Sequence, residues 1–279
     1  MGVSLTRTAG RSEVIALVSE SPSRFYDERY RSGYQEAILD SGYDACVLEA
    51  LRWAVGDSGV RAGSVLDYGC GQGRYLPVLA ALVPGADLHG ADISPVALDL
   101  AAERFPAAEL ARIDGERVPH EPGRFDLIVM VDVIEHVLDA PATVAELQRL
   151  LRPGGVVVLT TPSANRGSAA WAYNRLLAGF EETPDGTGRF ATDEPAHLRR
   201  LRSGEARELL ARGGLELEAQ RFWGHLGTPL GDSFDRLPLR LRRRLAMLDW
   251  KLLRRLPNGG AMVLRARKPL TGGAARNGR

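Results

Sequence analysis

Short apolar runs that alternate with helical segments constrain the fold of this 279-residue chain more than any other feature. After a helical stretch over 25–56, the period of the apolar residues changes, and a helix or a turn-rich link separates each strand-like run from the next. Such alternation is typical of βαβ units, which build a parallel sheet covered by helices on both faces. The expected strands are 64–69, 87–92, 108–114, 125–133, 155–161, 215–224 and 259–268.

The first expected strand leads into a glycine-rich loop, VLDYGCGQGRY, in which Gly69, Gly71 and Gly73 stand at alternate positions. A tight turn explains one or two of these glycines through positive φ, whereas three favour a ligand lying against bare backbone. In an open α/β sheet, such a ligand binds beyond the carboxyl ends of the strands. The dinucleotide fingerprint G-x-G-x-x-G would place its third glycine at Arg74, and Asp67 would repel phosphates. The loop therefore favours a cationic ligand.

The pattern D-x-G-x-G-x-G, formed by Asp67 and the three glycines, resembles motif I of class I S-adenosylmethionine-dependent methyltransferases. The resemblance continues in order through GADIS, ARIDGE, FDLIVMVDVIEHV and LLRPGGVVVLTTP, and more weakly to Lys268. It implies an α/β, Rossmann-like class I methyltransferase fold with a mostly parallel seven-stranded sheet of order 3-2-1-4-5-7-6, strand seven being antiparallel. It also implies S-adenosyl-L-methionine as the cofactor.

The resemblance assigns cofactor-binding roles to residues at successive strand ends. Asp92 would accept from both ribose hydroxyls, Ile93 would pack on the adenine, and Asp114 would contact the adenine amino group. The sulfonium and ammonium groups of the cofactor would explain the carboxylate of Asp67. The expected cofactor-binding residues are Asp67, Gly69, Cys70, Gly71, Gly73, Asp92, Ile93, Asp114, Gly115, Val131 and Asp132.

His136, just past the fourth expected strand, is the candidate general base for a hydroxyl acceptor, because its near-neutral pKa suits proton abstraction. Glu135 is the second catalytic candidate, although both side chains could instead cap a helix or pack at the floor of the pocket. Methyl transfer is an in-line displacement, so the protein mainly aligns the nucleophile with the methyl group. The chain lacks the [DN]-P-P-[YF] motif that accompanies amino methylation in this superfamily, which favours an oxygen acceptor.

Asp132, Glu135 and His136 together also offer ligands that suit a divalent metal, and His197 could supply a fourth. The spacing resembles the E-x-x-E-H metal motif of small-RNA 2′-O-methyltransferases and the same E-H-V region of ubiquinone-pathway O-methyltransferases. Asp132 stands where that motif has its first glutamate, and its shorter side chain argues against a metal. Magnesium is therefore an alternative and not the main expectation.

Composition narrows the class of protein further. The 36 basic and 35 acidic residues give a formal charge of +1, so no global field attracts nucleic acid. The two cysteines, Cys46 and Cys70, form no C-x-x-C pair, so neither a disulfide framework nor a thiolate zinc site is indicated. Apolar runs of signal-peptide or membrane-spanning length are lacking, and a cytoplasmic protein is expected.

We expect one methyltransferase domain over 25–268, a flexible lead-in over 1–24 and a disordered tail over 269–279. Residues 163–200 are expected to form a lid or substrate insertion, because so long a connection is rarely a plain loop. The Arg- and Leu-rich segment 235–257 is expected to be a basic amphipathic helix that covers the sheet edge. The same helix could instead make a peripheral contact with an anionic membrane or bind RNA phosphates.

The sequence thus predicts a methyltransferase that transfers a methyl group to a small-molecule acceptor, through a hydroxyl oxygen. Three alternatives remain open: a metal-assisted RNA 2′-O-methyltransferase, a non-catalytic S-adenosylmethionine-binding module and an NAD-linked oxidoreductase. The missing third glycine and Asp67 argue against the oxidoreductase. The intact acidic residues around the loop argue against a non-catalytic module.

Overall fold

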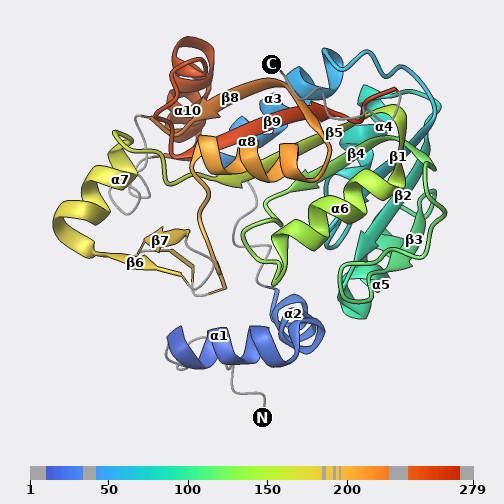
Figure 1. The fold of residues 1–279 in the computed structure, drawn as a ribbon, viewed down its shortest axis with the longest axis horizontal. Helices are drawn as coiled ribbons and strands as arrows, with labels where there is room; N and C mark the ends of the chain where they lie inside the picture. Colours follow the sequence, from blue (N-terminus) through green and yellow to red (C-terminus); the bar gives the residue numbers. More distant parts are fainter. Residues whose placement is uncertain are drawn as a thin grey trace, which may run out of the picture.

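A seven-stranded sheet of order β3-β2-β1-β4-β5-β9-β8 forms the centre of the molecule, with helices on both faces (Figure 1). The computed structural model describes residues 11–33, 42–183, 187–190, 193–194, 196–225 and 238–270. The strands are β1 (Ser64–Tyr68), β2 (Asp87–Asp92), β3 (Glu109–Arg112), β4 (Phe125–Val131), β5 (Leu151–Pro162), β8 (Glu216–Trp223) and β9 (Ala261–Arg267).

The strand directions confirm the expected class I methyltransferase sheet. β1, β2, β3, β4 and β5 pair in parallel, whereas β9 runs antiparallel to both β5 and β8. β4 reads FDLIVMV and is buried along its whole length. Continuous burial of this kind is expected for a parallel strand covered on both faces.

Two hydrophobic clusters fill the two sides of the sheet. One contains residues of α6 (Ala140–Leu150) and α8 (Ser203–Arg212), and the other contains residues of α3 (Gly42–Gly56), α4 (Leu76–Leu82) and α10 (Leu239–Leu253). α5 (Pro95–Arg104) begins at the N-cap residue Ser94, whose hydroxyl accepts from the backbone of Ala97. The amino end of α5 therefore lies directly after the carboxyl end of β2.

The prediction of a flexible lead-in over 1–24 is wrong for its second half, since α1 (Arg11–Glu20) and α2 (Pro22–Arg31) are helices. Val14 and Val18 are buried in a small cluster with Phe25 and Ala196, so the helices gain tertiary packing that composition does not reveal. Residues 1–10 lie outside the described residues, as do 34–41 of the predicted helical stretch and 271–279 of the predicted tail.

The predicted insertion over 163–200 forms a small unit beside the main sheet (Figure 1). Its elements are α7 (Ala169–Tyr173), the π-helix η2 (Asn174–Ala178) and a two-stranded antiparallel sheet of β6 (Phe180–Glu182) and β7 (Gly188–Phe190). Phe180 and Phe190 pack ring to ring across this pair, with centroids 6.0 Å apart. We call residues 163–200 the insertion below.

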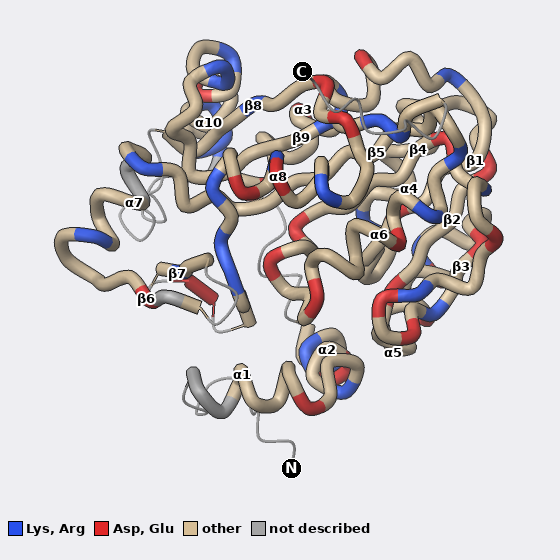
Figure 2. Tube along the Cα trace, in the orientation of Figure 1, with Lys and Arg blue, Asp and Glu red and all other residues tan. Residues whose placement is uncertain are grey.

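The predicted basic helix is observed as α10, and residues 235–237 lie outside the described residues. Its Trp250 is buried against Trp223 of β8, and its Asp249 accepts from the backbone of Gly224 and His225. One side of α10 thus covers the sheet, while Figure 2 shows basic positions along it. Contact with a membrane or RNA through this helix stays a prediction. Among the described residues, no helix has the length and apolar character needed to cross a membrane.

Candidate active site

The glycine loop after β1 turns tightly against the end of β2. The backbone N–H groups of Gly69 and Cys70 both donate to the Ala91 carbonyl, at 2.7 and 2.9 Å. Gly69, Gly71 and Gly73 all have positive φ, at 77°, 53° and 72°. Backbone conformation therefore accounts for all three glycines, where the sequence interpretation allowed one or two. At Gly69 a Cβ atom would also lie 2.4 Å from a methyl group of Val133, so this glycine permits close approach of the loop after β4.

Asp92, at the end of β2, fixes the loop. Its carboxylate accepts from the backbone N–H of Gly71 at 2.8 Å and from that of Ser94 at 2.9 Å. Burial nevertheless raises the pKa of Asp92 to about 6, against the opposing effect of these hydrogen bonds. Each carboxylate oxygen has two acceptor positions, so Asp92 can still accept from a ligand hydroxyl while it holds the loop.

Asp67 lies beneath the loop with a carboxylate that has no hydrogen-bond partner among the described residues. The side chain is 1% exposed, and burial together with the nearby charge of Asp92 raises its pKa to about 7. An unsatisfied buried carboxylate is costly, and a neighbouring cation removes that cost. The position therefore fits a ligand that carries positive charge near the loop.

A cavity of about 230 Å³ lies at the carboxyl ends of β1, β2 and β4. Of the residues predicted from the sequence, it is lined by Gly69, Asp92, Ile93, Gly115, Val131, Asp132 and His136. The remaining predicted residues do not line it: Asp67, Cys70, Gly71, Gly73, Asp114, Glu135 and His197. Asp114 is exposed in a turn closed by reciprocal backbone bonds with Arg117. Its predicted contact with an adenine stays a prediction.

Helix α2 covers the cavity, and the sequence interpretation gave its residues no role. Tyr26, Arg29 and Tyr30 line the cavity from this helix. Their spacing places them on one helical face, and this was the signal available in the stretch RFYDERY. Burial raises the pKa of both tyrosines well above the ordinary value, so they present neutral hydroxyl-bearing rings.

Polar contacts dock α2 onto the start of α5. Asp27 accepts from the Ser94 hydroxyl at 2.5 Å and from the Val96 backbone at 3.4 Å. The Ser23 hydroxyl donates to the Ile93 carbonyl at 3.0 Å. These bonds join the covering helix to the strand end that supplies Asp92, so the position of α2 and the shape of the cavity are linked.

The returning end of the insertion also reaches the cavity. Arg29 of α2 forms an ion pair with Glu194, and Glu194 also lines the cavity. The backbone N–H of Leu198 donates to the Glu135 carbonyl at 2.9 Å. The insertion thus meets both α2 and the loop after β4, where the candidate base lies.

His136 is held in one orientation at the cavity wall. Its Nδ1 lies 3.0 Å from the Ala196 carbonyl, a group that can only accept. Nδ1 therefore carries the proton in the neutral ring, which leaves the lone pair on Nε2. Burial lowers the pKa of His136 below its ordinary value, so the neutral form prevails at neutral pH. A neutral imidazole with a free lone pair is the form that a general base requires.

Asp132 and Glu135, in the loop after β4, each accept a hydrogen bond from a threonine of β5. Asp132 has positive φ, at 53°, and its carboxylate accepts from the Thr160 hydroxyl at 2.8 Å. Glu135 is buried, accepts from the Thr161 hydroxyl at 3.0 Å and has one oxygen without a partner among the described residues. Burial raises the pKa of both carboxyls, that of Asp132 to about 6.

Three of the four residues that the sequence suggested as metal ligands lie close together. Ligand atoms of Glu135, His136 and His197 lie within 4.8 Å of one another. Asp132 is outside this group, although the predicted motif included it. The residues present could hold one divalent ion with three ligands, and magnesium, which prefers oxygen ligands, suits a set with two imidazoles poorly.

The sequence profile of a family described as "Methyltransferase domain" matches residues 36–220, more than half of the chain. A ubiquinone biosynthesis O-methyltransferase of Thiobacillus denitrificans is 34% identical over 176 residues, covering 60% of this chain and 71% of that protein. Its counterpart from Pseudomonas aeruginosa UCBPP-PA14 is 31% identical over 147 residues, covering 50% of this chain and 62% of that protein.

Solved structures support the same fold. The complex of the Haloferax volcanii Trm112 methyltransferase activator with a methyltransferase gives a TM-score of 0.59 at 17% identity, covering 88% of this chain and 97% of the matched chain. A protein described as a sarcosine dimethylglycine methyltransferase, from Galdieria sulphuraria, gives a TM-score of 0.51 at 18% identity. The match covers 85% of this chain and 88% of the matched chain. At these identities the likeness concerns the fold alone.

Proposed function

Because this chain belongs to the methyltransferase-domain family and is a class I S-adenosylmethionine-dependent methyltransferase, we propose that it methylates a hydroxyl oxygen of a small molecule. The observation that carries the proposal is a single cavity lined both by Asp92, the ribose-binding candidate, and by His136, the candidate base. A cofactor bound at Asp92 and an acceptor beside His136 would share one enclosed space. Alignment of the two reactants is the main task in such a displacement.

The cofactor fits the residues at the strand ends. When bound, S-adenosylmethionine supplies an activated methyl group on a sulfonium. Asp67 offers a buried, unpartnered carboxylate to the positive charge of that ligand, and Asp92 offers acceptor positions to its hydroxyls. Tyr26 and Tyr30 of α2 line the covered side of the cavity and would limit the access of water to the bound cofactor.

His136 would take the proton from the acceptor hydroxyl at Nε2, since Nδ1 is engaged with the Ala196 carbonyl. Removal of that proton raises the nucleophilicity of the oxygen at the moment of attack. The curated relatives are named as ubiquinone biosynthesis O-methyltransferases, which supports an oxygen acceptor of this class. The choice of acceptor would depend on the insertion, which contributes Glu194 to the lining of the cavity.

A labelled-methyl transfer screen tests this proposal. Phenols, sugars, lipids and RNA would be offered to the wild type and to His136→Ala, each with and without EDTA. We expect transfer to a hydroxyl-bearing small molecule, unchanged by EDTA and reduced by roughly 10²-fold or more in His136→Ala. Glu208→Ala, at an exposed position of α8 outside the cavity lining, serves as the control.

Two outcomes contradict the proposal. Transfer to RNA alone, abolished by EDTA and weakened steeply by salt, would favour the metal-assisted RNA 2′-O-methyltransferase instead. Binding of the cofactor with no transfer to any acceptor class would favour a non-catalytic module.

A further inference from the structure

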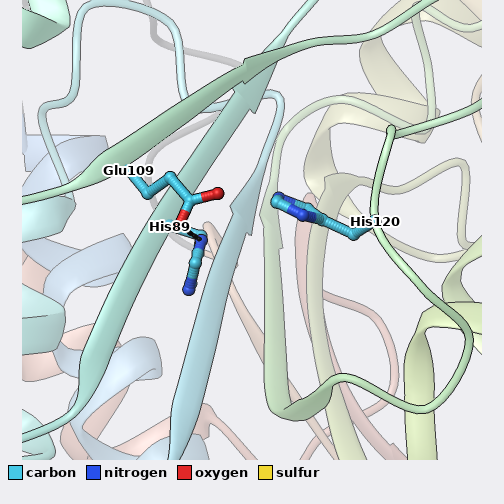
Figure 3. A group of neighbouring side chains, drawn as sticks. All are labelled: His89, Glu109 and His120. Carbon is cyan, nitrogen blue, oxygen red and sulfur yellow. Dashed lines mark ion pairs between the residues drawn. The ribbon is translucent and has the colours of Figure 1, made fainter.

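A second group of potential metal ligands lies away from the cavity, on the amino-terminal side of the sheet. His89 is in β2, Glu109 begins the edge strand β3, and His120 lies in the connection that leads to β4 (Figure 3). Their ligand atoms lie within 4.8 Å of one another. The cofactor cavity is at the opposite, carboxyl ends of these parallel strands, so the two sites are separate.

Sheet register, and not local spacing, brings these side chains together. His89 and Glu109 are direct partners in the parallel pairing of β2 with β3. His120 packs edge to face against His89, with ring centroids 5.2 Å apart, and both rings contact Phe125. No short sequence motif joins the three residues, so sequence patterns did not indicate the site.

Two imidazole nitrogens in the group lack hydrogen-bond partners among the described residues. They are Nδ1 of His89, whose side chain is fully buried, and Nε2 of His120. His89 Nδ1 lies 3.6 Å from a carboxylate oxygen of Glu109. A buried nitrogen without a hydrogen-bond partner is uncommon in proteins, and a cation bound between these residues would give both nitrogens one.

Two groups contact Nε2 of His89: the Asp87 carboxylate at 2.9 Å, which can only accept, and the Arg124 guanidinium at 3.2 Å, which can only donate. The shorter contact, to Asp87, favours a proton on Nε2, and displacement of Arg124 by a cation would remove the competing donor. The lone pair is then on Nδ1, which faces Glu109. A carboxylate behind a histidine that presents its other nitrogen is the usual outer-shell arrangement of a metal-binding histidine.

The local charge also suits a cation. Asp87 and Glu109 bring two carboxylates, and the guanidinium of Arg124 lies between them, 3.5 Å from Glu109 and 3.6 Å from Asp87. A second guanidinium, that of Arg149, donates to the backbone carbonyl of His120 at 2.8 Å and is paired with Glu146. Arg124 is 37% exposed and can turn outward when a cation enters. Glu109 is exposed, so the site is open to solvent on one side.

We infer that His89, Glu109 and His120 bind a divalent transition metal, with Zn²⁺ as the best match to two imidazoles and one carboxylate. Donors at about 2.0–2.2 Å from zinc lie roughly 3.4 Å apart, so the group must close by roughly an ångström, which His120 can supply from its connecting segment. The bound ion would tie the edge strand β3 to β2 and to the connection before β4. Its role would be to stabilise this corner of the sheet, because the reacting groups lie at the other end.

Zinc titration of metal-free, untagged protein tests the inference, with competition against a chromophoric chelator and thermal unfolding as two readouts. The wild type should bind Zn²⁺ and unfold at a higher temperature in its presence. His120→Ala and Glu109→Gln should each weaken binding by at least about tenfold and remove the thermal shift, as loss of a ligand costs no less than loss of an outer-shell partner. Arg124→Gln should tighten binding, since the competing guanidinium is gone.

His197→Ala separates this site from the group beside the cavity. It should leave zinc affinity unchanged, and S-adenosylmethionine affinity should be the same in His120→Ala as in the wild type. Circular dichroism of each metal-free variant confirms that it has folded. The inference is overturned if the wild type shows no zinc binding, if folded His120→Ala binds as tightly as the wild type, or if His197→Ala removes the binding.

Discussion

Asp67 is the residue that most distinguishes the glycine loop after β1 from a phosphate-binding loop. It is buried without a partner among the described residues, and its pKa is raised to about 7 by burial and by the charge of Asp92. A positive charge nearby would favour the ionised form of this carboxyl. The unliganded loop therefore already holds a buried carboxyl that a cationic ligand would stabilise.

Asp67→Asn should therefore weaken S-adenosylmethionine binding by about tenfold or more, through loss of one charge interaction. The unliganded protein should show a second effect. The folded pKa is raised from 3.8 to about 7, so the stability that Asp67 contributes is full below the lower value and is lost as the pH rises through the higher one. The free energy of unfolding, measured in urea at about pH 5 and about pH 8, should therefore fall less between the two pH values in the variant than in the wild type. An identical change in both proteins would contradict the assignment.

His136 should set the acidic limb of the activity profile. Its pKa is lowered from 6.5 by burial, and the neutral ring is the active form, so kcat/KM should persist below pH 6.5 and fall as the pH drops through the lowered pKa. His136→Gln should remove this limb and reduce kcat by roughly 10²–10⁴. An unchanged acidic limb in His136→Gln would show that another group is responsible.

At the scale of elements, the placement of α2 over the cavity is the feature that sequence patterns did not anticipate. The strands follow from apolar periodicity, whereas their order and the site residues at the ends of β1, β2 and β4 follow from the family resemblance that begins with the motif at Asp67. The position of α2 depends instead on single contacts between distant parts of the chain, such as Asp27 with Ser94. Period and composition carry no information about such long-range pairs.

The contact between Asp27 of α2 and Ser94 leads to a prediction about cofactor affinity. Asp27→Ala removes the acceptor for the Ser94 hydroxyl and should lower S-adenosylmethionine affinity by about tenfold, because hydrogen bonds to charged groups contribute about 1.5–3 kcal/mol. Arg24→Ala is the matched control, since Arg24 lies on the same helix and is 72% exposed. Calorimetric titration of both variants measures the difference. Equal losses in the two, or none in Asp27→Ala, would show that α2 does not shape the site.

At the scale of the whole molecule, the two ends of the parallel strands carry different groups of residues. The carboxyl ends of β1, β2 and β4 surround the cavity, whereas the amino-terminal side of β2 and β3 carries the inferred metal ligands. The part of the cavity lining at the ends of β1, β2 and β4 was predictable, because those residues follow strands within short motifs. The inferred metal site was not, because His89, Glu109 and His120 meet only through strand register and a connecting segment.

Calorimetric titration of the folded protein with S-adenosylmethionine tests the central claim, that carboxylates at the strand ends bind a cationic nucleoside. We predict saturable binding to the wild type and a loss of at least about tenfold in Asp92→Ala, whose carboxylate both lines the cavity and holds the loop. Unfolding curves would confirm that the variant is folded. Saturation with a nicotinamide dinucleotide, and no heat with S-adenosylmethionine or its demethylated product, would contradict the account.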